Sequence, residues 1–176
     1  MPRIIGRRFP WTAVMLALAP MQVWGAQAPR VAATGPVPAQ IINAKKVFIS
    51  NLGGGCSPFG QSEISGGPDR AYNKFYSAMK SWGRFDLEAA PADAELDVEV
   101  SFPCPATRAN SPYGPSYGTD NDPQLSLVIR DVKTGIVLWG LTEHIETAAL
   151  VSNRDKNFER AMRTLIDRLE GLVAGR

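Results

Sequence analysis

The sequence predicts an α/β (α+β) fold, a two-layer sandwich in which one mixed sheet of four to five strands is covered by two helices. Residues 96–102 alternate apolar and polar side chains, which is the period of a strand with one buried face. Apolar side chains recur every three or four residues over 72–82 and again over 158–173, which indicates two amphipathic helices. One sheet covered by two helices is the simplest way for such elements to bury their apolar faces.

Composition and charge exclude several classes of protein. With 44% hydrophobic and 20% charged residues, the chain of 176 residues is neither collagen-like, nor a coiled coil, nor fully disordered, nor a multi-span membrane protein. The formal net charge of +2 depends on three arginines near the start. Residues 1–25 contain three of the 19 basic side chains and none of the 17 acidic ones. The rest of the chain therefore has 16 basic and 17 acidic side chains. This near-neutral balance argues against a nucleic-acid partner.

The first segment, residues 1–25, predicts a secretory signal peptide. Arginines come first, an apolar run over 11–19 follows, and small residues surround the exit. The run is too short to cross a bilayer core of about 30 Å as a helix. Cleavage after Gly25 is preferred, and cleavage after Ala28 is the alternative. We therefore expect a periplasmic or secreted protein that meets the membrane only through the signal peptide before cleavage.

The mature chain is expected to begin with a flexible tether and to continue as one domain. Residues 26–40 are rich in Ala, Pro, Val and Gly without periodicity, which indicates the tether. The single α/β domain is expected over 41–176. Its first strand is predicted over 46–52, a β-branched and aromatic run, and the glycines Gly53–Gly55 are interpreted as a flexible exit from it.

The next elements follow from local patterns. A helix is predicted over 72–82, with Asp69 in its first turn and Gly83 ending it. Phe85 and Leu87 predict a short strand before the alternating strand at 96–102.

The second half of the domain predicts an irregular loop, a hairpin and a closing helix. Residues 103–123 contain five prolines and no apolar periodicity, which indicates an irregular loop. A strand begins at Leu125, turns back through Asp131–Gly135 and returns over 136–141 toward residue 145. Ser152 and Asp155 have the spacing of a capping box for the last helix, so the expected order is β-α-β-β-β-β-α.

Two glycine motifs lack the context that their chemistry requires. Gly53–Gly55 could cradle a phosphate, but no lysine follows before Lys74 and Pro58 stands where a dinucleotide fingerprint needs glycine. Residues 114–118 match the G-x-S-x-G elbow of hydrolases, but no strand precedes them and no helix pattern follows. We expect structural loops at both places.

The two cysteines, Cys56 and Cys104, are expected to form a disulfide in an exported protein. Each follows a predicted strand, so both emerge at one end of the sheet if those strands are parallel neighbours. Two free thiols remain an alternative, and a catalytic thiol with His144 as its base is a third.

No metal or cofactor site is expected. His144 has Glu143 and Glu146 nearby, but a lone histidine does not build a zinc site without other strong ligands. Residues 120–122 lack the spacing of a calcium loop. Four acidic residues alternate along one face of the predicted strand: Asp93, Glu95, Asp97 and Glu99. Paired carboxylates of this kind could serve glycosidic chemistry, although acids on one face of a strand are more typical of its solvent side.

Several segments together resemble a group of uncharacterised bacterial secreted proteins. They are the strand VFISNL, the helix end YSAMKSWGRF, residues 91–97, the hairpin LSLVIRDVKTGIVLW and the closing amphipathic helix. More loosely, the element order over 45–173 is similar to the amino-terminal domain of TolB and to LpoB-type activators of penicillin-binding proteins. The chain departs from the latter because it lacks a lipobox cysteine, so outer-membrane anchoring does not carry over. The resemblance implies a noncatalytic module that binds a protein partner in the envelope.

Two classes of function remain open. The first is an exported binding or accessory module that acts through protein–protein contacts, with no enzyme activity and no cofactor. Its candidate contact residues are Tyr113 and Tyr117 in the long loop, because tyrosines are enriched at interfaces. The second is a small secreted hydrolase that acts on cell-wall or extracellular substrates.

Overall fold

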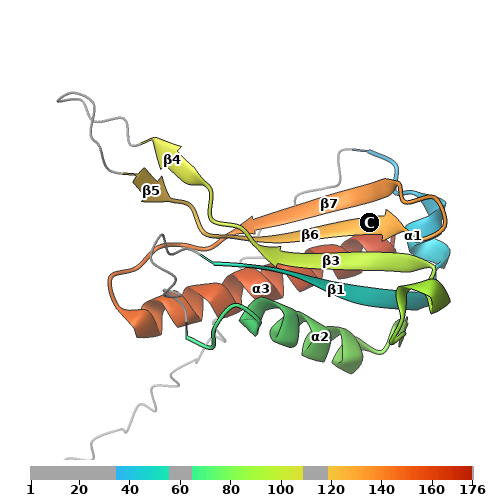
Figure 1. The fold of residues 1–176 in the computed structure, drawn as a ribbon, viewed down its shortest axis with the longest axis horizontal. Helices are drawn as coiled ribbons and strands as arrows, with labels where there is room; N and C mark the ends of the chain where they lie inside the picture. Colours follow the sequence, from blue (N-terminus) through green and yellow to red (C-terminus); the bar gives the residue numbers. More distant parts are fainter. Residues whose placement is uncertain (1–34, 56–64, 109–118, 176) are drawn as a thin grey trace, which may run out of the picture. The chain divides into compact units, whose positions relative to one another are not determined.

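A computed structural model describes residues 35–55, 65–108 and 119–175, and the side chains of 106–108 and 119–121 are not described. A five-stranded mixed sheet has the order β2-β1-β3-β6-β7 (Figure 1). β1 pairs in parallel with β2 and β3, whereas β3, β6 and β7 are successively antiparallel. The strands are β1 (Lys46–Gly54), β2 (Asp86–Leu87), β3 (Leu96–Phe102), β6 (Gln124–Asp131) and β7 (Val137–His144).

Two helices cover one face of this sheet (Figure 1). α2 (Arg70–Trp82) packs on β1 and β3, and α3 (Val151–Val173) packs on β6 and β7. The alternate side chains of β3 that face the helices are buried, and its intervening side chains are half-buried on the other face. Each large core side chain contributes about 1.5–3 kcal/mol of stability by its burial. The predicted fold class, one mixed sheet covered by two helices, is confirmed.

The local signals that end α2 and turn β6 into β7 work as predicted. Gly83 follows α2 with φ 66°, and its N–H donates to the carbonyl of Met79. In the turn, Asp131 Oδ1 accepts hydrogen bonds from the backbone N–H and the hydroxyl of Thr134, at 2.7 and 2.8 Å. Gly135 has φ 69°, a conformation that a side chain disfavours. The two hydrogen bonds from Thr134 also lower the pKa of Asp131.

A short helix spans the junction between the predicted tether and the predicted domain. α1 (Ala39–Asn43) starts inside the expected tether, and its Ile41 is completely buried in the core. Arg84 fixes the end of this short helix by donating to the carbonyls of Ile42 and Ala44, at 2.8 and 3.1 Å. A single turn of 3-10 helix, η1 (Pro91–Asp93), leads into β3.

The predicted capping box of α3 is wrong. The helix begins at Val151, its N-cap Leu150 makes no side-chain cap hydrogen bond, and Ser152 lies inside the first turn. Asp155 bonds instead to Ser65 and to Arg70 of α2. A tertiary partner that carries a positive charge outcompetes the local cap, because charge-assisted hydrogen bonds are the stronger kind.

Four predicted features fall outside the described residues: the signal peptide over 1–25, the tether up to residue 34, Cys56, and the tyrosines Tyr113 and Tyr117. Among the helices that the structure describes, none has an apolar stretch of the length that a bilayer crossing needs.

Candidate functional site

The exits of β1 and β3 lie side by side at one end of the sheet. Gly54 of β1 is opposite Phe102 of β3, and a register shift between Asn51 and Gly53 marks a bulge just before them. Gly53 and Gly54 have φ of 66° and 127° and still belong to the strand. The interpretation of these two glycines as a flexible exit is therefore wrong. Glycine suits both positions because of their positive φ, and at Gly54 also because the backbone approaches Phe102 closely.

A small ribbon extends from this end. β4 (Ala106–Arg108) and β5 (Thr119–Asn121) pair in antiparallel fashion within the region expected to be irregular. Two backbone bonds join the base of the ribbon, Asp122 N–H to Pro105 O at 3.1 Å and Gln124 N–H to Pro103 O at 3.0 Å. Figure 1 shows the ribbon projecting beyond the five-stranded sheet. We call the group formed by Gly53–Gly55, Pro103–Pro105, β4, β5 and Asp122 the loop end.

The pairing of the cysteines stays a prediction, since Cys56 lies outside the described residues. Cys104 is half-buried against the core, two residues beyond Phe102. Cys56 is likewise two residues beyond Gly54, the residue opposite Phe102. The strands that precede the two cysteines are thus the parallel neighbours that the disulfide requires.

The only histidine of the sequence contacts an aspartate at the base of the ribbon. His144 Nδ1 lies 3.0 Å from Asp122 Oδ1, and Gln124 Nε2 donates to Asp122 Oδ2 at 2.6 Å. These hydrogen bonds, that of His144 first, lower the pKa of Asp122. The His144 side chain is 70% exposed. The pair joins the end of β7 to the ribbon.

The acidic residues around His144 have structural partners. Glu143 pairs with Arg168 at 3.2 Å and Glu146 with Arg160 at 3.0 Å, so neither converges on His144. Within the described residues, no group of three metal-ligating side chains comes together.

On β3, Asp97 accepts a hydrogen bond from Ser50, and Glu99 pairs with Arg130 at 3.0 Å on the face away from the helices. Glu95 accepts from the N–H groups of Lys45 and Lys46, and these bonds lower its pKa. These carboxylates bond to neighbouring segments instead of converging as a catalytic pair.

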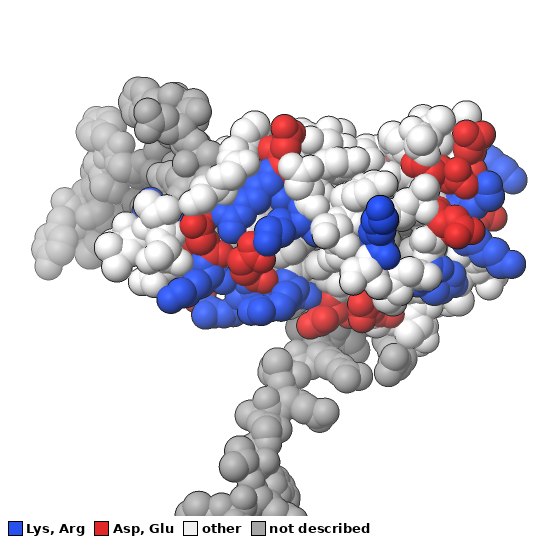
Figure 2. All heavy atoms as spheres, turned by 90° about the horizontal axis from the view of Figure 1, so that it is seen from below, with Lys and Arg blue, Asp and Glu red and all other residues white. Residues whose placement is uncertain are grey.

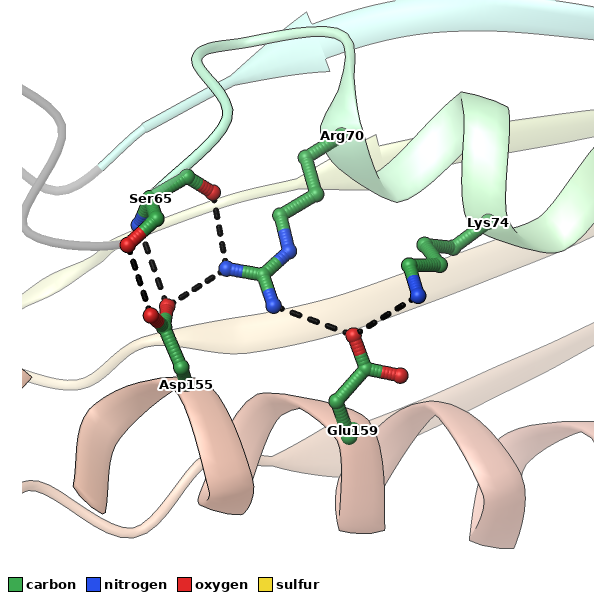
Figure 3. Close-up of polar contacts among 5 residues, drawn as sticks. All are labelled: Ser65, Arg70, Lys74, Asp155 and Glu159. Atoms are coloured by element: carbon green, nitrogen blue, oxygen red, sulfur yellow. Dashed lines mark hydrogen bonds and ion pairs between the residues drawn. The ribbon is translucent and has the colours of Figure 1, made fainter. Parts of the chain in front are cut away.

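A network that the sequence patterns did not indicate joins the N-terminal halves of α2 and α3 (Figure 3). The guanidinium of Arg70 bonds to Asp155 at 2.5 Å and to Glu159 at 3.0 Å, and Lys74 pairs with Glu159 at 3.1 Å. Ser65 donates its hydroxyl and its N–H to Asp155, and with the Arg70 bond these lower the pKa of Asp155 to about 2.

The same guanidinium lies 4.5 Å from the ring centre of Phe158, which contacts Phe102 edge to face at 6.2 Å. The network is thereby connected to the strand that leads into the loop end. The two carboxylates that bond Arg70 are 85 and 89 positions away in the chain, so no local pattern could have identified them.

Comparisons with known proteins give structural likeness only. No family model matches the chain, and no curated protein matches it. The C-terminal domain of LpoB from Salmonella enterica is similar at 12% identity and TM-score 0.37, over 58% of this chain and 83% of that one. TolB from Acinetobacter baumannii has 12% identity and TM-score 0.38, over 75% of this chain but only 29% of its own.

The uncharacterized lipoprotein B from Nitrosomonas europaea has 10% identity and TM-score 0.42, over 81% and 90% of the two chains. The similar solved structures thus include LpoB and TolB, the two proteins that the sequence loosely resembles. At these identities and TM-scores the likeness is a loose one of fold and carries no statement about what this chain does.

Proposed function

We propose that this protein is an exported accessory module of the bacterial envelope that binds a protein partner through its loop end and catalyses no reaction. The observation that carries the proposal is the pairing of Gly54 with Phe102, which brings two chain exits to one place on a rigid sheet. Binding residues are disproportionately found on loops that a rigid scaffold positions.

The surroundings of the loop end support a binding role. Backbone hydrogen bonds join the two arms of the β4–β5 ribbon at its base, where the arms continue from β3 and into β6, so the segment that carries Tyr113 and Tyr117 starts from a fixed platform. Tyrosine contributes a large contact area at low entropic cost, which suits a partner-binding loop. The acidic side chains of β3, of the end of β7 and of α3 bond to neighbouring strands and helices, as side chains that stabilise a fold do.

The binding role is tested with paired tyrosine variants. The partner is first identified by crosslinking in the envelope fraction, and its capture by purified protein is then measured. We expect Tyr113→Ala with Tyr117→Ala to weaken that capture while the free energy of unfolding changes by less than about 1 kcal/mol. Tyr76→Ala is the matched control, since Tyr76 is a 37% exposed tyrosine on α2, away from the loop end. Equal capture by the tyrosine double variant and the wild-type protein would remove the loop from the proposal.

Export is tested separately. Cleavage after Gly25 leaves Ala26 as the first residue of the protein recovered from the envelope or the medium, and cleavage after Ala28 leaves Pro29. N-terminal sequencing distinguishes these two results from an intact Met1, which would contradict export.

The hydrolase remains the second candidate, and the contact between Asp122 and His144 is the observation in its favour. A carboxylate on Nδ1 orients a histidine so that Nε2 can act as a base. If the pair is catalytic, His144→Ala abolishes hydrolysis of peptidoglycan or ester substrates by the exported protein, and Glu146→Gln leaves it intact. No hydrolysis by the wild-type protein would reject this candidate.

A further inference from the structure

α3 begins with two exposed apolar side chains, and three exposed basic side chains follow on the solvent face of its first four turns. Leu150 and Val151, where the helix begins, are 64% and 50% exposed. Lys156, Arg160 and Arg163 follow at spacings of four and three residues, which places them on one face of the helix, and all three are exposed. We call these five residues the α3 surface.

The α3 surface carries excess positive charge because three nearby carboxylates are already paired, although Asp167, an exposed residue one turn beyond Arg163, forms no ion pair in the described ranges. Asp155 and Glu159, which face α2, are bonded to Arg70 and Lys74 (Figure 3). Arg160 has one exposed partner, Glu146. Lys156 and Arg163 form no ion pair with any side chain in the described ranges.

Figure 2 views the helix-covered side, and in its left half Lys and Arg side chains gather around a smaller number of carboxylates. The chain after residue 25 is close to neutral as a whole, so this excess is local. A local excess of cations on a near-neutral protein indicates an anionic partner for this part of the surface.

We propose that the α3 surface docks the exported protein onto an anionic phospholipid bilayer. Lys and Arg side chains near a negatively charged membrane surface are attracted to it and strengthen binding. Leu150 and Val151 supply the second contribution, because exposed apolar side chains gain free energy on entering the interfacial region. A purely acidic polypeptide would satisfy the cations but would give the exposed apolar pair nothing to contact.

The spacing along the helix is compatible with an oblique approach. Lys156 and Arg160 lie six and ten residues beyond Leu150, which is roughly 9 and 15 Å along the axis at 1.5 Å per residue. If the beginning of α3 points toward the bilayer, the apolar pair reaches the interface while the cations stay near the phosphates. This contact is independent of the proposed partner-binding loop, and it differs from the expectation that the protein meets a membrane only through its signal peptide.

Vesicle binding tests the proposal with the protein purified after export. We expect binding to vesicles that contain phosphatidylglycerol and far weaker binding to vesicles of phosphatidylcholine alone, with affinity that falls as salt is raised. Lys156→Gln with Arg163→Gln is expected to weaken binding by roughly 10- to 30-fold, at about 1 kcal/mol for each lost cation. Leu150→Ser with Val151→Ser is expected to weaken binding and to leave its salt dependence in place.

The chain provides a matched control for each pair of substitutions. Ile136 and Val137, at the β6–β7 turn, are 60% and 50% exposed, so Ile136→Ser with Val137→Ser removes equivalent apolar area elsewhere and should leave binding unchanged. Lys80→Gln with Lys133→Gln removes two exposed cations elsewhere and should likewise leave binding unchanged. Circular dichroism checks that each variant is folded.

Three results would overturn the proposal: no binding to the anionic vesicles, equal binding to both kinds of vesicle, or equal losses in the control variants. Binding to immobilised polyglutamate without binding to vesicles would assign the surface to an acidic polypeptide and would also overturn it. Because the assay contains no protein partner, its failure leaves the proposed function untouched, and loss of partner capture leaves vesicle binding untouched.

Discussion

Gly54 lies so close to Phe102 that a Cβ atom on Gly54 would stand 2.1 Å from the carbonyl oxygen of Phe102. The two residues are paired neighbours on parallel strands, and the contact sets the spacing of the chain at the loop end. A second constraint acts at the same residue, because its φ of 127° is a conformation that side chains rarely adopt.

Gly54→Ala is therefore expected to lower the free energy of unfolding by about 3 kcal/mol, through the clash and the backbone strain together. Chemical denaturation at neutral pH measures the change. Gly55→Ala is the control: a Cβ at Gly55 would meet no atom within 4 Å, so we expect a change below about 0.5 kcal/mol. Similar effects of the two substitutions would show that the approach to Phe102 does not constrain the fold.

The network of Asp155 predicts a pH dependence of stability. The pKa of Asp155 is lowered from the ordinary 3.8 to about 2, so its contribution is fully present above pH 3.8 and is lost as the pH falls through about 2. Asp155→Asn is expected to lower the free energy of unfolding by about 1 kcal/mol at pH 6, a modest value because solvent reaches the pair.

The difference between the wild-type protein and Asp155→Asn should shrink between about pH 4 and pH 2, where protonation removes the same charge in the wild-type protein. Asp167→Asn, at an exposed position of α3, provides the comparison and is expected to show no such trend. A difference that stays constant down to pH 2 would contradict the role of Asp155.

The predicted disulfide between Cys56 and Cys104 can be tested by alkylation. We expect no thiol to react in denatured, unreduced protein and two thiols to react after reduction. In the chain-entropy model, a crosslink that closes about 49 residues stabilises the fold by roughly 4 kcal/mol, within a range of about 0–5 kcal/mol. Reduced protein, or Cys104→Ser, should unfold at correspondingly lower denaturant concentration. Two reactive thiols before reduction would refute the bond.

Arg168 is predicted to protect the free edge of the sheet. Backbone groups of successive strand residues point alternately toward and away from the neighbouring strand. The N–H of Ile145 points toward β6, where it donates to the carbonyl of Pro123, so the backbone of Thr142, three residues earlier, points away from β6. Arg168 donates to the carbonyl of Thr142 on this free side, at 2.7 Å. Because an open strand edge is a template for pairing with another chain, Arg168→Ala should promote self-association.

Analytical ultracentrifugation over a range of protein concentrations measures this effect, and Lys80→Ala serves as the control for loss of a surface cation. We also expect Arg168→Ala to lower the free energy of unfolding by about 1 kcal/mol. A monomeric Arg168→Ala variant at every concentration would show that other features keep the edge of β7 unpaired.

Alternation, helical period and turn chemistry predict elements correctly wherever the determining interactions are local. The strand at 96–102, the helix ended by Gly83 and the turn closed by Asp131 and Gly135 all depend on residues within a few positions of one another. The pairing of His144 with Asp122 could have been suspected, because both stood out in the sequence, but nothing local placed them 3.0 Å apart.

By itself the sequence determined the layered fold, the order along the chain of the main strands and the two large helices, and the acidic face of β3. The tertiary structure alone decided that Ala39 and Gln40 belong to a helix, that Gly54 belongs to a strand, that residues 106–108 pair with 119–121, and that Asp155 bonds Arg70 instead of capping α3. Each of these outcomes depends on a partner outside the local segment, at 11 to 15 positions for the small ribbon and at more than 40 for Gly54 and Asp155. Local patterns record the preferences of a segment, whereas such contacts form only after the sheet and the helices have packed together.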